Sequence, residues 1–373
     1  MSHEWKAAVH EVVERTSMEN NINRVVVVGG AGYLGSTLCA HLVGLGYEVA
    51  SVDAHWFGDD ALRPLHGHPG FSSQKVDVPH SDKVLPLLRG CEAVIWVAGL
   101  VGDPACAIDV EFTYTCNYHS TLALADICKR LGICRFIFAS SCSVYGRSNS
   151  EVASLSEESA TCPLSYYAED KLACEKALQG MADDFFHPTI LRLATLFGWS
   201  NRMRFDLVLN VLTARACRAE TLEITGGGQR RPFLHVKDAA AAFANVLSSD
   251  VSLISNGIFN VGADFNNHRI LDIADLIFSA IPSARMKFFS EAIDLRDYQV
   301  DFSKIARTLG YRPRFSVAEG ITEIQQKLSE ANGINIADPL YINEKRTRQL
   351  ITEIWRNNYR PPSTVAGSVG SAA

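Results

Sequence analysis

Two adjacent tyrosines and a lysine in the stretch PLSYYAEDK, residues 163–171, have side chains that could transfer protons. Side chains four residues apart lie on one face of a helix, whereas those of direct neighbours point in different directions. Tyr167 stands four residues before Lys171, while Tyr166 has the same spacing to Asp170, whose charge would oppose a phenolate. If either tyrosine works with Lys171, it is therefore Tyr167. An ordinary amphipathic helix with a surface lysine has the same spacing, so the context decides.

A glycine-rich stretch, GGAGYLG, occupies residues 29–35 between a β-branched run at 24–28 and apolar residues with helical spacing. Glycines in such a turn let the chain bend tightly, let the backbone approach a pyrophosphate and let helix and strand pack closely. The N–H groups at the start of the helix then attract the anion. The stretch therefore predicts a dinucleotide-binding turn, with cofactor contacts from Gly29, Gly32, Tyr33, Leu34 and Gly35.

Asp53 ends the next strand-like run, 47–53, about twenty residues after the glycines, as a dinucleotide site requires. Its carboxylate should accept hydrogen bonds from the adenosine ribose hydroxyls and would repel a 2′-phosphate. The sequence therefore predicts NAD rather than NADP as the cofactor. Asp77, followed by Val78, ends the strand after that and could contact the adenine, although an ordinary turn at a strand end would look the same.

Strand-sized apolar runs alternate with helical stretches through the first half of the chain. The strand-sized runs are 24–28, 47–53, 71–78, 93–99, 135–141 and 189–198, and the clearest helical stretches are 105–131 and 165–182. Continuous apolar strands that alternate with helices are typical of a parallel sheet covered on both faces. The pattern predicts an α/β fold with a Rossmann-type doubly wound parallel sheet, and ligands across the carboxyl ends of its strands.

The composition is that of a globular protein and argues against several classes. Of 373 residues, 47% are hydrophobic and 20% charged, and the net charge is −6, whereas nucleic-acid-binding proteins usually carry a basic patch. The longest apolar stretch, near 21–30, is too short to span a membrane, and the charged N-terminus lacks the apolar core of a secretion signal. Ten scattered cysteines without a C-x-x-C pair favour reduced thiols and no metal site. We expect a cytoplasmic protein that binds neither nucleic acid nor membrane.

Several motifs occur in the order and spacing of the extended short-chain dehydrogenase/reductases. They are GGAGYLG, Asp53, VAG at 97–99, SSCSVYG at 140–146, and Tyr167 with Lys171. From about residue 22 to residue 330 the chain resembles the NAD-dependent nucleotide-sugar epimerases and dehydratases of that family. Two further stretches, VGDPAC at 101–106 and RMRFDLVLN at 202–210, resemble a sub-branch that includes GDP-heptose-modifying enzymes.

The resemblance implies roles for individual residues. Ser141 stands four residues before the tyrosine of the V-Y-G motif, where the family has a catalytic Ser or Thr. Tyr167 matches the family's base, and Lys171 matches the partner that also holds the nicotinamide ribose. Further NAD contacts are implied for Val97, Ala98 and Asn117. Substrate contacts are implied for Ser141, Cys142, Thr195, Arg231 and Arg296, with the two arginines on the nucleotide diphosphate.

A tyrosine base must lose its proton near neutral pH, whereas the pKa of a free tyrosine is about 10. One cation about 5 Å away, at an effective dielectric constant of about 20, supplies roughly 3 of the roughly 4 kcal/mol required. We therefore expect Lys171 and the positive nicotinamide ring to hold Tyr167 as a phenolate. His235 and Asp238 are expected to be structural, with Asp238 as the N-cap of a helix.

The residues beside Ser141 bear on the reaction. In the 4,6-dehydratases that the chain resembles, an Asp and a Glu follow the catalytic Thr and eliminate water, and related decarboxylases also have the Glu. Here the two positions hold Cys142 and Ser143, whereas Tyr167 and Lys171 remain. The pattern favours a 4-epimerase that passes through a transient 4-keto nucleotide hexose or heptose.

Four alternatives stay open: a nucleotide-sugar 4-dehydrogenase, a 4,6-dehydratase, an oxidoreductase of non-sugar substrates, and a cofactor-binding regulator without catalysis. Arg231 and Arg296 argue against a non-sugar substrate, which needs no diphosphate contact. Tyr167 and Lys171 argue against the regulator, because such proteins typically lose one of them.

The resemblance also implies a homodimer and a division of the chain. Related enzymes pair two helices of each subunit into a four-helix bundle, here the stretches 105–131 and 165–182. The NAD-binding domain is expected over 22–190, with segments around 230–262 returning to it, and a smaller C-terminal α/β substrate lobe mainly over 191–335. Residues 1–21 are expected to be an N-terminal extension, 336–360 a helical extension and 361–373 a disordered tail.

Overall fold

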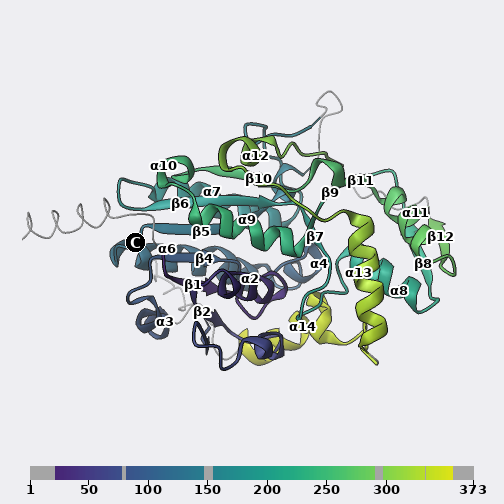
Figure 1. Cartoon of the computed structure of the whole chain (residues 1–373), viewed down its shortest axis with the longest axis horizontal. Coiled ribbons are helices and arrows are strands. Elements are labelled where there is room, and N and C mark those ends of the chain that lie inside the picture. Colours follow the sequence, from purple (N-terminus) through teal and green to yellow (C-terminus); the bar gives the residue numbers. More distant parts are fainter. Residues whose placement is uncertain (1–21, 78–80, 147–153, 290–296, 332, 356–373) are drawn as a thin grey trace, which may run out of the picture.

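The structure is a computed structural model and describes residues 22–77, 81–146, 154–289, 297–331 and 333–355. Figure 1 shows a large sheet with helices on it and, at one end, a smaller group of strands and helices. The predicted N-terminal extension and C-terminal tail lie outside the described residues. No helix in the described part of the chain is long and apolar enough to cross a membrane.

A seven-stranded parallel sheet forms the larger part. In spatial order its strands are β10 (Ile258–Val261), β6 (His187–Leu193), β5 (Arg135–Ser141), β4 (Ala93–Trp96), β1 (Arg24–Val28), β2 (Glu48–Asp53) and β3 (Phe71–Lys75). Each neighbouring pair is parallel. The chain adds strands on one side of β1 as far as β3 and then returns to add β4 on the other side. The predicted doubly wound sheet is confirmed, and its switch point lies between β1 and β4.

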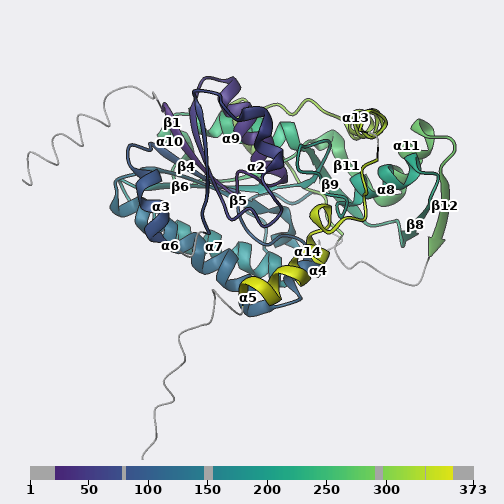
Figure 2. The same ribbon diagram turned by 90° about the horizontal axis from the view of Figure 1, so that it is seen from below.

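Helices cover both faces of this sheet because its strands are apolar on both sides. Val25 and Val27 of β1 belong to one buried cluster, whereas Val26 and Val28 belong to another. The first face packs against α2 (Tyr33–Gly44), α9 (Val236–Ser248), α10 (Val251–Ile254) and α12 (Ser303–Leu309). The second face packs against α3 (Ser81–Leu88), α6 (Ser120–Arg130) and α7 (Tyr166–Met181), and Figure 2 shows helices of the two groups on opposite sides of the sheet.

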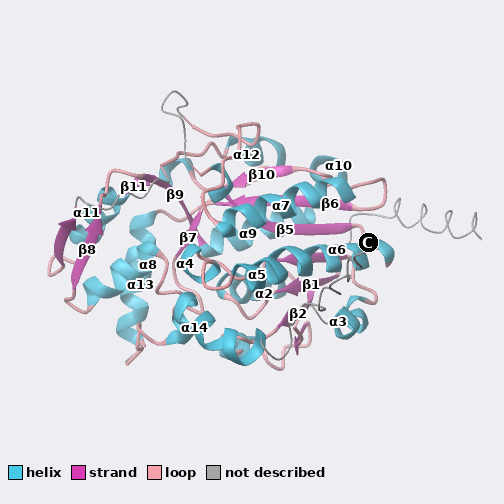
Figure 3. Ribbon diagram, turned by 180° about the vertical axis from the view of Figure 1, so that it is seen from behind, coloured by secondary structure: helices cyan, strands magenta, loops and turns pink. Residues whose placement is uncertain are grey.

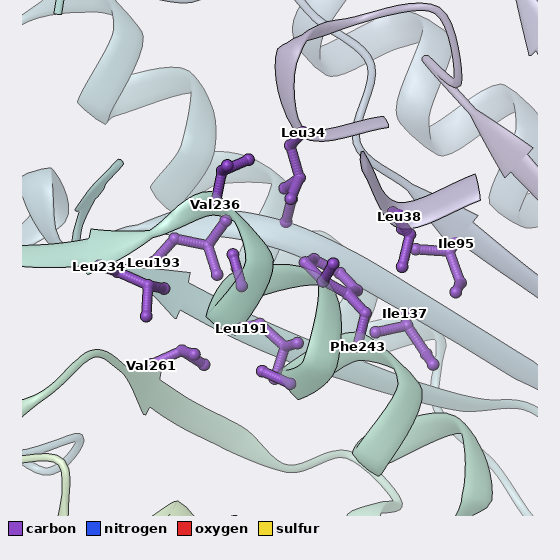
Figure 4. Packing of buried hydrophobic residues seen from close by; sticks show 14 of the residues in the cluster. Leu34, Leu38, Ile95, Ile137, Leu191, Leu193, Leu234, Val236, Phe243 and Val261 are labelled. Carbon is purple, nitrogen blue, oxygen red and sulfur yellow. The ribbon is translucent and has the colours of Figure 1, made fainter. Parts of the chain in front are cut away.

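Packing of α2 on the sheet places the glycine turn. Leu38 of α2 and Phe243 of α9 lie over the sheet with Ile137 and Leu191 of its central strands, as Figure 4 shows. All four side chains are fully buried. Burial of each stabilises the fold by about 1.5–3 kcal/mol relative to exposure. The first turn of α2 is therefore held at the carboxyl end of β1.

A smaller lobe lies at one end of the molecule (Figure 3). It contains a three-stranded sheet with β11 (Asn267–Arg269), β9 (Arg230–His235) and β7 (Thr195–Phe197), and a two-stranded sheet with β12 (Arg285–Phe289) and β8 (Thr221–Thr225). Its helices are α8 (Val208–Cys217), α11 (Ile270–Ala280) and α13 (Val317–Glu330). Apolar side chains from these elements form a separate buried cluster.

The apolar run 189–198, expected as one strand, is divided between the two parts. Residues up to Leu193 form β6 of the large sheet, whereas Thr195–Phe197 form β7, which pairs with β9 of the small lobe. Ala194 stands between them, and its N–H still donates to the Val261 carbonyl at 2.9 Å. Both strands are apolar, so the run carries no signal for the change of partner.

The remaining segments are mostly short helices and turns. The predicted helical stretch 105–131 is divided into α4 (Asp103–Cys106), α5 (Val110–Tyr114), the π-helical turn η2 (Thr115–His119) and α6. The predicted extension 336–360, as far as it is described, contains η5 (Pro339–Tyr341), α14 (Asn343–Leu350) and η6 (Ile351–Trp355). Three further 3₁₀ turns are η1 (Asp60–Leu65), η3 (Cys142–Tyr145) and η4 (Asp264–Asn266).

Asp238 does not cap α9, so that prediction was wrong. The N-cap is His235, whose ring nitrogen accepts a hydrogen bond from the Lys237 N–H at 3.2 Å. Asp238 stands one turn further on and accepts from the N–H groups of Arg314 and Phe315 at 3.0 and 2.9 Å. Its carboxylate therefore ties α9 to the loop before α13.

Glu323 of α13 links this helix to the end of β9 and the start of α9. Its carboxylate lies 2.8 Å from the His235 ring, accepts from the Trp199 N–H at 2.8 Å and pairs with Lys237. Burial opposes ionisation, but these hydrogen bonds outweigh it and lower the pKa of Glu323 from 4.5 to about 2. A carboxyl with a lowered pKa stabilises the fold above its ordinary pKa, and this stabilisation is lost as the pH falls toward the folded value.

We expect Glu323→Gln to lower the free energy of unfolding by about 2–3 kcal/mol at pH 7. Urea titrations should show this difference shrinking as the pH falls from 4.5 toward about 2. Glu330→Gln, at an exposed ion pair with Lys327 on the same helix, is the matched control and should change little. A Glu323→Gln difference that does not depend on pH would rule out this account.

Candidate active site

The glycine turn joins β1 to α2 so tightly that side chains are excluded. Gly29 has φ +89°, and a Cβ on Gly35 would lie 1.9 Å from the Gly29 carbonyl oxygen. Gly32 is the N-cap of α2, and no described side chain caps the N–H groups of the first turn. A helix N-terminus of this kind favours a phosphate. The turn therefore fits the pyrophosphate of a dinucleotide.

Asp53 lies beside the turn at the end of β2. One carboxylate oxygen accepts from the Ala31 N–H at 3.0 Å and the other from the His55 N–H at 2.8 Å. Burial raises the pKa of Asp53, and these two hydrogen bonds act against that rise. Each carboxylate oxygen can accept a second hydrogen bond, so the group stays suited to two ribose hydroxyls.

Asp53→Ala is expected to weaken NAD binding and to relax the discrimination against NADP, because the carboxylate that would repel a 2′-phosphate is lost. Titration of both dinucleotides against the wild type and the variant measures the change in the ratio of dissociation constants. Tighter binding of NADP than NAD by the wild type would contradict the role assigned to Asp53.

A cavity of about 350 Å³ opens along the carboxyl ends of the strands. Most of the residues predicted from the sequence line it. On the cofactor side they are Gly29, Gly32, Tyr33, Leu34, Gly35, Asp53, Asp77, Val97 and Ala98, and on the catalytic and substrate side Ser141, Tyr167, Lys171, Thr195 and Arg231. The fold thus brings together residues more than two hundred positions apart in the chain.

Ser141 and Tyr167 meet at this cavity from two neighbouring elements. Ser141 ends β5, and its hydroxyl accepts from the Ser143 N–H at 3.1 Å. Tyr167 stands in the first turn of α7, which Ser165 caps by accepting from the Ala168 N–H. The Ser141 side chain lies close enough to Tyr167 to lower the pKa of the tyrosine as a hydrogen-bonding group. A serine and a tyrosine placed in this way can share one proton-transfer path to a substrate oxygen.

Lys171 is buried below the tyrosine, with its ammonium group 5.9 Å from the centre of the Tyr167 ring. The same group donates to the Ala139 carbonyl at 2.7 Å and lies 4.6 Å from the Phe138 ring. Burial lowers the pKa of Lys171. The lysine is therefore fixed between the end of β5 and the cavity.

The protein's own groups favour the protonated form of Tyr167, so the expected phenolate stays a prediction for the NAD-bound protein. Burial raises the pKa of Tyr167 above its ordinary value. The hydrogen bond from Ser141 and the charge of Arg204 lower it, but by less. The sequence shows the Tyr–Lys spacing, whereas the loss of solvent around the hydroxyl appears only in the folded chain.

Two of the predicted residues are absent from the described lining of the cavity, and two others lie outside the described residues. Cys142 is buried, donates to the Arg192 carbonyl at 3.2 Å and is absent from the described cavity lining. Asn117 is also absent from that lining; its amide binds the Leu100 N–H and C=O at 2.8 and 3.1 Å and so braces the loop after β4. Val78 and Arg296 lie outside the described residues.

The cavity lining also includes residues for which the sequence analysis predicted no individual role. Arg202 and Arg204 line it, as do Asp103 of α4 and Asn343 of α14. Both arginines belong to RMRFDLVLN, where two cations in an apolar segment are a signal that could have been read. Nothing near Asn343 in the sequence indicates that it reaches a site formed by the first half of the chain.

Comparison with known proteins agrees with this geometry. Residues 25–262 match the NAD dependent epimerase/dehydratase family. UDP-glucuronic acid decarboxylase 1 of Danio rerio is 27% identical over 345 residues, which cover 88% of this chain and 79% of that protein. UDP-glucose 4-epimerase of Yersinia pestis is 28% identical over 322 residues, which cover 79% and 94%.

A solved structure shares the architecture as well as the sequence pattern. The UDP-glucuronic acid 4-epimerase from Bacillus cereus, in complex with UDP-glucuronic acid and NAD, has a TM-score of 0.74 and is 26% identical, over 82% of this chain and 99% of that one. The family is NAD-dependent, and the glycine turn and Asp53 fit that cofactor. The chain belongs to the NAD-dependent epimerase/dehydratase family of enzymes.

Proposed function

We propose that the protein is a nucleotide-sugar 4-epimerase that inverts C4 of a nucleotide hexose or heptose through a transient 4-keto sugar. One observation carries the proposal. Ser141 and Tyr167 face the same cavity as the dinucleotide turn, while the position two residues after Ser141 holds Ser143. The side chain at that position is thus a hydroxyl rather than a carboxylate, so it cannot serve as the general base of an elimination.

Proton transfer by the protein follows from the geometry. NAD⁺, when bound, would supply the hydride acceptor and donor for C4 and a positive charge beside the tyrosine. Tyr167 accepts the proton of the sugar 4-hydroxyl as the C4–H bond breaks, which leaves a C4 carbonyl. Ser141 orients the 4-oxygen beside Tyr167. After the sugar turns over, Tyr167 returns the proton, so atoms and charge balance over the cycle.

Arg231 supports a nucleotide diphosphate substrate. It lies on β9, lines the cavity, and has its guanidinium 5.5 Å from the Tyr298 ring, which also lines the cavity. A planar guanidinium binds phosphate oxygens through two parallel hydrogen bonds. The similar UDP-glucose 4-epimerase and UDP-glucuronic acid 4-epimerase support the same class of substrate.

A dehydratase is the second candidate because one carboxylate does lie near the tyrosine. Asp103 lines the cavity, and its charge raises the pKa of Tyr167. An elimination would need such a group to remove the C5 proton. The two candidates therefore differ in whether the C5–H bond breaks.

Incubation with NAD⁺ and a panel of nucleotide hexoses and heptoses in deuterated water separates these outcomes. An epimerase converts one substrate into its C4 epimer and leaves every ring carbon unlabelled, because the hydride returns from the cofactor. Deuterium at C5, or a 6-deoxy-4-keto product, would show elimination instead. Release of a 4-keto sugar with one NADH per turnover would show a 4-dehydrogenase.

We also propose a cytoplasmic homodimer. Val110 and Tyr114 of α5 and Tyr166 of α7 expose 40, 38 and 48% of their surfaces, on elements that contact each other. Exposed apolar side chains grouped on neighbouring helices mark an association surface. Light scattering at micromolar concentration should give twice the chain mass, and Val110→Glu with Tyr114→Glu should shift the protein toward monomer. A wild-type monomer would contradict the proposal.

A further inference from the structure

Arg202 is a buried cation at the wall of the cavity with unused hydrogen-bonding capacity. Only 6% of the surface of Arg202 is exposed. Its guanidinium lies 4.0 Å from the centre of the Phe57 ring. One terminal nitrogen donates to the Asn343 amide oxygen at 2.7 Å. The Nε–H has no hydrogen-bond partner among the described residues. Such a donor, buried at a cavity wall, points to a ligand that accepts from it.

The charge of Arg202 is also poorly balanced. Burial and, after it, the charge of the neighbouring Arg204 lower the pKa of Arg202 to about 9. Of the two carboxylates that act on Arg202, Asp206 is bound by Arg204 at 2.9 and 3.0 Å, and Asp53 accepts from backbone N–H groups. A buried cation without a bound carboxylate is costly, and an anionic ligand offsets that cost.

The chain around Arg202 is tied to the first turn of α2. The Tyr33 hydroxyl donates to the Gly198 carbonyl at 2.7 Å, and the Ser200 hydroxyl donates to the Tyr33 carbonyl at 2.7 Å. Ser36 and Ser200 lie 3.1 Å apart through their hydroxyl oxygens. These contacts hold Arg202 beside the uncapped N-terminus of α2 and beside Asp53. Arg202, Gly32 and Asp53 all line the same cavity.

We propose that Arg202 binds the diphosphate of NAD together with the N–H groups of the first turn of α2. Its planar guanidinium supplies a charge that the glycine turn lacks. The proposal concerns cofactor binding and does not depend on which sugar is the substrate or on the reaction at C4.

The C-terminal segment completes this cofactor site through Asn343. Besides accepting from Arg202, its side chain donates to the Val101 carbonyl at 2.9 Å, and its N–H donates to Asp206 at 3.0 Å. Asn343 opens α14, which packs against α4 (Figure 2) and follows the family-matched residues 25–262 by a long stretch of chain. Asn343 is therefore a positioning residue that holds the guanidinium in place.

Affinities of the full-length chain for NAD⁺, ADP and adenosine test the proposal. Arg202→Gln should weaken NAD⁺ and ADP by about 10- to 100-fold, the loss typical of a hydrogen bond to a charged group, and adenosine by less than about 2-fold. Arg202→Lys keeps the charge without the planar fork and should fall between. Arg130→Gln, at an exposed arginine paired with Asp126 on α6, is the matched control and should change no affinity.

Asn343→Ala should weaken NAD⁺ and ADP by about 3- to 10-fold, and adding it to Arg202→Gln should cause no further loss, because Asn343 acts through Arg202. Circular dichroism and melting without ligand check that each variant folds, and if Arg202→Gln does not, Asn343→Ala decides. Unchanged ADP affinity in the folded variants, or equal losses for ADP and adenosine, would overturn the proposal. So would a loss confined to the nucleotide sugar.

Discussion

Tyr167→Phe is expected to lower turnover by about 10²- to 10⁴-fold and to leave the dissociation constant for NAD⁺ within about 2-fold of the wild type. The variant removes only the oxygen that accepts and returns the proton of the sugar hydroxyl. The ring stays in place beside Lys171, and the contacts of the glycine turn and Asp53 do not involve Tyr167. Steady-state kinetics and cofactor titration measure the two quantities separately.

Tyr166→Phe is the matched control, because Tyr166 is the neighbouring tyrosine on the same helix and 48% of it is exposed. Its loss of one oxygen should leave turnover unchanged. Equal losses of turnover in the two variants would mean that both tyrosine hydroxyls act by stabilising α7, and would contradict proton transfer by Tyr167.

The pH dependence adds a second measurement on the same residue. Only the phenolate form of Tyr167 can accept a proton; burial raises the pKa of this group and the charge of bound NAD⁺ would lower it, so turnover should rise with pH until the pKa of the NAD-bound form is reached. Ser141 lowers this pKa by its hydrogen bond. Ser141→Ala should therefore move the rising limb to higher pH, as well as slow the reaction at neutral pH.

The cofactor half of the site could be predicted from the sequence because its determinants are local. The glycines of 29–35 and the spacing to Asp53 fix a turn, a helix start and a strand end within one βαβ unit. Alternating apolar and helical runs predicted the parallel sheet for the same reason, since the central strands β1, β4 and β5 are buried on both faces.

The rest of the site depends on contacts between distant segments. Arg202 and Asn343 are 141 residues apart, and Lys237 and Glu323 are 86 residues apart, so no short motif contains either pair. The transfer of Thr195–Phe197 to the small sheet is decided by its pairing with β9. The raised pKa of Tyr167 comes from the loss of solvent around its hydroxyl. The spacing of residues in the sequence does not predict this burial.

Glu175→Gln should lower the free energy of unfolding by about 3–5 kcal/mol, because it removes the carboxylate from a buried ion pair. Glu175 of α7 and Arg192 of β6 have side chains only 1 and 5% exposed, and the closest oxygen and nitrogen are 2.7 Å apart. Glu175 also accepts from the Ser140 hydroxyl, one residue before Ser141. The pair thus fixes α7, which carries Tyr167, against the two strands beside the cavity.

The expected loss of stability comes mainly from the buried charge of Arg192 that is left without a carboxylate, rather than from the net stabilisation that the intact ion pair provides. Arg192 would keep its charge in a buried site, with only neutral close side-chain acceptors among the described residues, which are the introduced amide oxygen and the Tyr145 hydroxyl at 3.0 Å. Arg192→Met in the Glu175→Gln background removes that charge and should therefore recover part of the lost stability. Asp126→Asn, which breaks the exposed pair with Arg130, should cost less than about 1 kcal/mol. If urea unfolding shows the Glu175 and Asp126 variants equally stable, the pair is not what holds α7 in place, and Tyr167 must be positioned by apolar packing alone.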